Sequence, residues 1–144
     1  MIRKLIIATL ASTLIAAGAA PAMANSLFIQ QYGYGHSVGG GQTGWNNTFG
    51  AHQNGWWNKA ISQQSGGNNV SAIGQDGVNN YGDVKQNGWN NAGGVGQFGS
   101  NHTTILTQDG NGNIAAGVQV GNGCNANVVQ HGSNNVTAFV QACP

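Results

Sequence analysis

The sequence repeats with a strict period of eleven residues. Glutamine recurs at this spacing over 111 residues without insertion or deletion, at Gln31, Gln42, Gln53, Gln64, Gln75, Gln86, Gln97, Gln108, Gln119, Gln130 and Gln141. A fixed short period is the sequence signature of a stacked repeat architecture. We therefore expect residues one structural period apart to lie on top of one another.

Two further columns keep the same phase. A glycine follows each repeat-starting glutamine two residues later, from Gly33 to Gly132. Five residues after the glutamine stand Asn47, Asn58, Asn69, Asn80, Asn91, Asn113 and Asn135, with His36, His102 and Cys124 in the remaining three units. A disordered low-complexity tract is the alternative, but such tracts are biased in composition without keeping phase. Ten uninterrupted units of Gln-x-Gly-x-x-Asn argue against it.

The first residues differ from the repeats. Arg3 and Lys4 form a basic start, an apolar run follows over 5–17, and Ala22-Met23-Ala24 is an A-x-A cleavage site. This pattern is typical of a secretory signal peptide and is too short to span a membrane. We expect a signal peptide over 1–24 and a mature domain over 25–144, without membrane insertion.

Charge is scarce in the repeats. The whole chain carries a net charge of +1, which becomes −1 when Arg3 and Lys4 are removed with the signal peptide. No basic footprint for nucleic acid remains, so we expect no nucleic-acid partner. A net charge near zero favours self-association. Proline is absent from Asn25 to Cys143, so nothing of this kind interrupts strand pairing.

Each unit predicts one short strand and one turn. The Gln-x-Gly-x-x-Asn half is rich in residues that tolerate turns, which places Asp76, Asp109 and the tryptophans Trp45, Trp56 and Trp89 in turns. The five positions before the next glutamine hold most of the β-formers. Two units make a 22-residue coil. The predicted fold is all-β, a β-solenoid or cross-β stack of about five coils built from ten eleven-residue units.

Alternation along a strand predicts the interior. Positions five, seven, nine and eleven after the glutamine share a face that carries asparagine, glutamine and small or apolar residues, whereas Lys59, Asp83 and Lys85 fall on the opposite face. Stacked amides can pair with identical groups in neighbouring coils, as they do in cross-β structures. We expect the glutamine and asparagine columns to be buried hydrogen-bonded ladders, open only at their ends.

These residues resemble the curlin subunits of bacterial curli, a secreted functional amyloid. The family repeat is Ser-x5-Gln-x-Gly-x-x-Asn-x-Ala-x3-Gln, and residues 53–64, 108–119 and 130–141 follow this frame. The opening segment 31–37 is similar to a first curlin repeat. The family's serine is usually asparagine here, which keeps a hydrogen-bonding side chain in the column. The repeats begin almost directly after Ala24, without the nonrepeat segment that curlin subunits typically carry.

The resemblance implies a structural subunit of extracellular fibres that support cell adhesion and the biofilm matrix. It implies assembly with copies of itself, and with a paralogous curlin subunit, as a major or nucleating component. It also implies export through the outer-membrane curli secretion pore with its assembly factors, and a cell-surface fibre, or fimbrium, as the final location.

Other function classes fit the residues less well. The chain has no glutamate and its three aspartates are scattered, so we expect no enzyme, catalytic residue, cofactor or metal site. A monomeric secreted β-solenoid that binds a surface or polysaccharide is the rival hypothesis. Trp45, Trp56 and Trp89 share one repeat position and are candidates for sugar contacts, although they more simply cover turn edges.

Cys124 and Cys143 are the two cysteines of a chain expected to be exported, where oxidation is the default. Cys124 takes the asparagine position of one turn, and Cys143 takes the glycine position one coil later. Coils about 4.8 Å apart bring these positions near disulfide range. We expect an intramolecular Cys124–Cys143 bond, with unpaired thiols or crosslinks between subunits as the alternatives.

Overall fold

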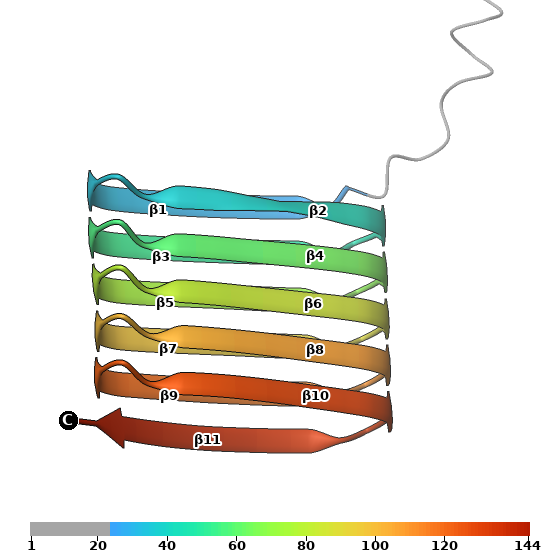
Figure 1. Cartoon of the computed structure of the whole chain (residues 1–144). Coiled ribbons are helices and arrows are strands. Elements are labelled where there is room, and N and C mark those ends of the chain that lie inside the picture. Colours follow the sequence, from blue (N-terminus) through green and yellow to red (C-terminus); the bar gives the residue numbers. More distant parts are fainter. Residues whose placement is uncertain (1–23) are drawn as a thin grey trace, which may run out of the picture.

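The computed structural model describes residues 24–144, so all of the expected signal peptide except Ala24 lies outside the described residues. The described chain forms a stack of strands without a helix (Figure 1). The strands are β1 (Ser26–Tyr34), β2 (Ser37–Trp45), β3 (Thr48–Trp56), β4 (Lys59–Gly67), β5 (Val70–Val78), β6 (Tyr81–Trp89), β7 (Ala92–Ser100), β8 (Thr103–Asn111), β9 (Ile114–Asn122), β10 (Asn125–Ser133) and β11 (Val136–Cys143).

Successive strands alternate between two parallel sheets. One sheet has six strands in the order β1-β3-β5-β7-β9-β11, and the other has five in the order β10-β8-β6-β4-β2. Each strand pairs in register with the strand 22 residues further on, so that Gln31 lies beside Gln53 and Gly33 beside Gly55. The expected all-β solenoid with 22-residue coils is confirmed, and β11 adds half a coil to five complete ones (Figure 1).

The strands are longer than the sequence predicted. They contain nine residues, or eight in β11, and include the Gln-x-Gly segment that was expected to turn. The repeat glycines have φ between 99° and 133°, which only glycine adopts readily, yet from Gly33 to Gly110 each still pairs with the glycine of the next coil. They bend the strand without ending it, so the prediction of turns there was wrong.

This correction moves several side chains from turns into strands. Asp76 lies in β5 and Asp109 in β8, both exposed on the outer surface. Trp45, Trp56 and Trp89 are the last residues of β2, β3 and β6. The side chains Lys59, Asp83 and Lys85 also lie on the outer surface, as the alternation predicts.

The true turns are two residues long. Their first residue sits four positions after the glutamine and is left-handed, with φ from 53° to 60° at six asparagines and from 68° to 73° at Gly35, Gly112 and Gly123. Asparagine and glycine tolerate this region best. Trp57 occupies it at φ 60°, and its ring lies against Gly35 one coil away.

A narrow core lies between the two sheets. It consists of Phe49, Ala51, Ala60, Ile73, Val84, Val95, Leu106 and Ala115, one or two small or medium side chains per strand. The flanking interior positions are filled by glutamine and asparagine. Polar columns therefore take up much of the space that an ordinary domain gives to aliphatic side chains.

Candidate functional site: amide columns and open solenoid ends

The glutamines form two continuous columns, one on the inner face of each sheet. Gln31, Gln53, Gln75, Gln97, Gln119 and Gln141 line the six-stranded sheet, and Gln42, Gln64, Gln86, Gln108 and Gln130 line the other. Each Nε2 donates to the Oε1 of the glutamine in the next coil at 2.8–3.0 Å. Members inside the stack are at most 2 % exposed, from Gln53 to Gln119.

Every interior glutamine of the columns makes at least two hydrogen bonds through its Nε2. Besides its bond along the column, Gln75 Nε2 donates to the backbone oxygen of Lys59 at 2.9 Å, across the coil. The same second bond recurs from Gln42 to Gln141. Among the described residues no buried side-chain nitrogen or oxygen lacks a partner. Because an unpaired buried amide costs about 1–3 kcal/mol, this completeness is what permits polar columns in a core.

The columns have a direction. All Nε2 donors point toward the C-terminal end and all Oε1 acceptors toward the N-terminal end. Within residues 24–144, Oε1 of Gln31 and of Gln42 receives no donor from a preceding glutamine. At the other end, Gln130 and Gln141 have no following glutamine to donate to. The two ends are therefore chemically complementary.

Asparagines form a second pair of columns at the turns. Asn25, Asn47, Asn69, Asn91, Asn113 and Asn135 precede the strands of one sheet, and His36, Asn58, Asn80, His102 and Cys124 those of the other. Each asparagine Oδ1 accepts the backbone N–H of the next column member at 2.9–3.1 Å. These bonds fix the backbone of each turn to the turn before it.

The asparagines are also hydrogen-bonded to the repeat glycines. Asn69 Nδ2 donates to the backbone oxygen of Gly88 at 2.9 Å, and Asn47, Asn58, Asn80, Asn91 and Asn113 bond the equivalent glycine of the next coil. A Cβ on Gly77 would stand 1.9 Å from the oxygen of Gly99. Sequence reasoning treated the glycine as a turn former and missed this link between two motif positions.

Histidine replaces asparagine without breaking the column. His102 is fully buried, and its Nδ1 accepts the backbone N–H of Cys124 at 3.1 Å. Its Nε2 lies 3.2 Å from the oxygen of Phe98, four residues earlier, where asparagines place Nδ2. His36 makes the same two contacts with Asn58 and Tyr32. An imidazole that accepts at Nδ1 and donates at Nε2 reproduces two of the hydrogen bonds of the amide, whereas the bond to the repeat glycine is missing.

Residues 77–110 match the family model described as the curlin associated repeat. No curated protein matches the chain. The 77–110 segment contains curlin repeats. The matched segment spans parts of β5 to β8, and its pattern of columns continues in register through the other described strands. The resemblance drawn from Gln-x-Gly-x-x-Asn is thereby confirmed at the level of the repeat family.

The two cysteines meet at the last repeat of the stack. A disulfide joins Cys124 and Cys143, whose Cα atoms are 5.6 Å apart. Cys143 pairs with Gly121 at the end of β11, and Cys124 is the last member of the turn column, one coil after His102. The arrangement is the one the repeat frame suggested. The oxidation state of these cysteines in the isolated protein stays a prediction.

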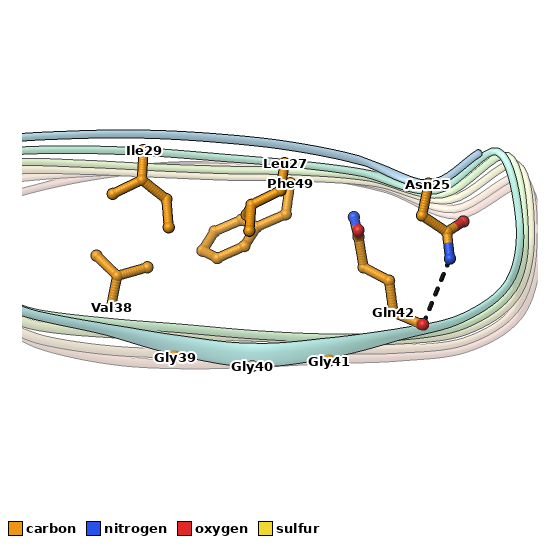
Figure 2. Close-up of a pocket in the computed structure, with 9 residues that line it drawn as sticks. All are labelled: Asn25, Leu27, Ile29, Val38, Gly39, Gly40, Gly41, Gln42 and Phe49. Atoms are coloured by element: carbon orange, nitrogen blue, oxygen red, sulfur yellow. Dashed lines mark hydrogen bonds between the residues drawn. The ribbon is translucent and has the colours of Figure 1, made fainter.

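The N-terminal end of the stack opens into a pocket of about 360 Å³. Leu27 and Ile29 line it from β1, Val38 and the glycines 39–41 from β2, and Phe49 lies beneath (Figure 2). Asn25 Nδ2 bonds the oxygen of Gln42 at its rim at 3.3 Å (Figure 2). Leu27 is 60 % exposed although it occupies an inward position. The first coil therefore presents its apolar interior to the outside.

The outer surface shows little that resembles a reactive centre. Tyr81 lies between Lys59, 5.6 Å from its ring centre, and Asp83, which accepts its hydroxyl at 3.2 Å. Partial burial raises the pKa of the Tyr81 phenol, and the charge and hydrogen bond of Asp83 raise it further. Residues 24–144 contain no group of three or more His, Cys, Asp or Glu placed to hold a metal. In the same range no helix is long and apolar enough to cross a membrane.

Proposed function

We propose that this chain is a structural subunit of extracellular, curli-like amyloid fibres that support cell adhesion and the biofilm matrix. In this proposal residues 1–24 direct secretion and residues 25–144 polymerise. The partner is a second copy or a paralogous curlin subunit, after export through the outer-membrane curli pore with its assembly factors. The role is structural and involves no catalysis.

The open ends of the stack carry this proposal. Soluble solenoids and sheets normally block their edge strands, because a row of unpaired N–H and C=O groups recruits other chains. Here β1 and β2 at one end, and β10 and β11 at the other, are the outermost strands of the two sheets. The glutamine columns end there with acceptors on one side and donors on the other. Adding a copy would satisfy both.

A direct experiment is unstirred incubation of purified residues 25–144. We expect fibres whose X-ray diffraction shows the strand spacing of about 4.7–4.8 Å along the axis. A monomer that persists at concentrations where curlin subunits assemble would contradict the proposal. It would favour the rival, a secreted solenoid that binds a surface or polysaccharide.

Matched glutamine variants test whether the columns drive assembly. Gln141 lies at the open end of a column, whereas Gln63 in β4 points to solvent on the outer face. We expect Gln141→Leu to lengthen the thioflavin-monitored lag time clearly more than Gln63→Leu, because only the first removes a donor that the next subunit meets. Equal lag times would mean that the column takes no part in templating.

A further inference from the structure

Residues 24–144 form an odd number of strands, and this sets the geometry of stacking. Six strands lie in one sheet and five in the other, so β11 extends half a coil beyond β10 (Figure 1). The next vacant position along the solenoid path is therefore beside β10, in the five-stranded sheet. A second copy that continues the path must place its first strand in the sheet opposite to the one that β1 occupies in the first copy.

We propose that a second copy docks with its β1 against β10 and its β2 against β11, so that successive subunits are related by about a half turn around the fibre axis. This inference rests on the proposed function and specifies how its self-assembly is built. At each junction the six-stranded sheet of one copy is followed by the five-stranded sheet of the next, and the five-stranded sheet is followed by the six-stranded one. Neither sheet has a gap.

The half-turn junction continues every hydrogen-bonded column. In the 22-residue register, Gln31 of the second copy lies beside Gln130, and its Gln42 lies beside Gln141. The incoming Oε1 acceptors thus meet Nε2 of Gln141, which bonds only the backbone oxygen of Asn125 in the single chain, and Nε2 of Gln130, whose second bond there is to Thr137 Oγ1. Gln97 Nε2 contacts a threonine hydroxyl and the following glutamine in the same way. Among the described residues, no turn follows Asn135 in its column. At the half-turn junction its Oδ1 lies at the backbone N–H of the second copy's His36, in the position where Asn113 Oδ1 accepts the N–H of Asn135.

Interior side chains also fit at this junction. Leu27 and Ile29 of the second copy lie over Ala126 and Val128, which covers two apolar residues that are 60 % and 42 % exposed in the single chain. The pocket of the second copy, with Gly40 in its wall (Figure 2), then lies against β11. Gly40 itself comes opposite Phe139.

The Phe139–Gly40 pairing has an internal precedent. Phe139 pairs with Gly117 in its own sheet, and a Cβ on Gly117 would stand 2.0 Å from the phenyl ring. Glycine occurs nine residues after a repeat glutamine in two units only, at Gly40 and Gly117. The half-turn junction places these two glycines on either side of the one phenylalanine found at this position. The bulky ring is thus flanked by the two positions that leave room for it.

The alternative junction, in which β1 of the second copy pairs with β11, lacks these features. If β1 of the second copy paired with β11, a strand-wide gap would separate β10 from β2 of the second copy. The edge of β10 would stay unpaired at the centre of a fibre, which is costly for buried backbone groups. Ile29 rather than Gly40 would then oppose Phe139.

Cryo-electron microscopy of fibres grown from residues 25–144 separates the two arrangements. Eleven strands over two sheets make five and a half coils, so the half-turn junction predicts a rise of about 26 Å per subunit, with a rotation near 180° added to the slow twist of the solenoid. A rise of about 29 Å without the half turn would overturn the inference while leaving fibre formation intact. Absence of fibres would instead overturn the proposed function.

Paired cysteine variants test the same junction in solution. Gln30, Val129 and Val140 all occupy exposed outer positions. The half-turn junction sets Gln30 of one copy beside Val129 of another, and the alternative sets it beside Val140. We expect Q30C/V129C fibres to give covalent multimers on mild oxidation, and Q30C/V140C fibres to stay uncrosslinked. The reverse result would contradict the inference.

Discussion

One pair of hydrogen bonds recurs at the fifth position of several repeats, made by asparagine or by histidine. An acceptor receives the backbone N–H of the following turn, and a donor reaches back four residues to a carbonyl. Asparagine does both with one amide, and His102 does both with two ring nitrogens. Sequence reasoning saw histidine merely as a substitute in the column. The structure shows which atoms make the substitution work.

His102 therefore provides a residue-scale prediction. We expect His102→Asn to keep stability close to that of the parent, because the amide restores both bonds. His102→Leu should lose about 1–3 kcal/mol, since it leaves the buried N–H of Cys124 without an acceptor. Guanidinium denaturation of the monomer, followed by tryptophan fluorescence, measures the difference. Equal losses for both variants would mean that volume, not hydrogen bonding, decides this site.

Strand boundaries show what periodicity can and cannot predict at the scale of the element. The period of eleven predicted parallel stacking, the 22-residue coil and the inward face, because each depends only on phase and alternation. It misplaced the turns, because glycine and asparagine are common in turns and their conformations are not visible in the sequence. Gly77 has φ +133° and stays in the ladder, whereas Asn79 has φ 57° and makes the turn.

The glycines of β5 and β7 give a matched pair for an element-scale prediction. We expect Gly77→Ala to destabilise the monomer by more than about 1–2 kcal/mol and to slow fibre formation, because the methyl group adds a clash with Gly99 to an unfavourable φ. Gly94→Ala is the control, since a Cβ there meets nothing within 4 Å. Thermal unfolding and thioflavin kinetics of both variants make the comparison. Similar behaviour of the two would contradict the bend assigned to Gly77.

At the scale of the whole molecule, the cysteine pair closes the last half coil onto the stack. We expect freshly secreted monomer to be two hydrogens lighter than the reduced chain, with the Cys124 and Cys143 peptides linked in non-reducing mass spectrometry. Closing a loop of this size, with a sequence separation of 19, stabilises by roughly 3 kcal/mol in the chain-entropy model. Reduction should therefore lower the denaturation midpoint. Free thiols in fresh monomer would contradict the pairing.

The parity of the strand count gives the last prediction. Inserting a second copy of residues 81–91 after Asn91 adds one complete unit inside the stack, with its interior Val84, Gln86 and Asn91 in phase. Both ends, the disulfide and the contacts of the proposed junction stay unchanged. The twelve strands now make six whole coils, so the next subunit begins in the same sheet as β1 of the first.

We therefore expect fibres of this variant to lose the half turn and to show a rise of about 29 Å, because the unchanged junction no longer reverses the sheets. Inserting the unit twice should restore the half turn at a rise of about 31 Å. Helical reconstruction of the three fibres, grown under one condition, gives both quantities. If the rotation per subunit were the same with no, one and two inserted units, the ends would not join along the solenoid path.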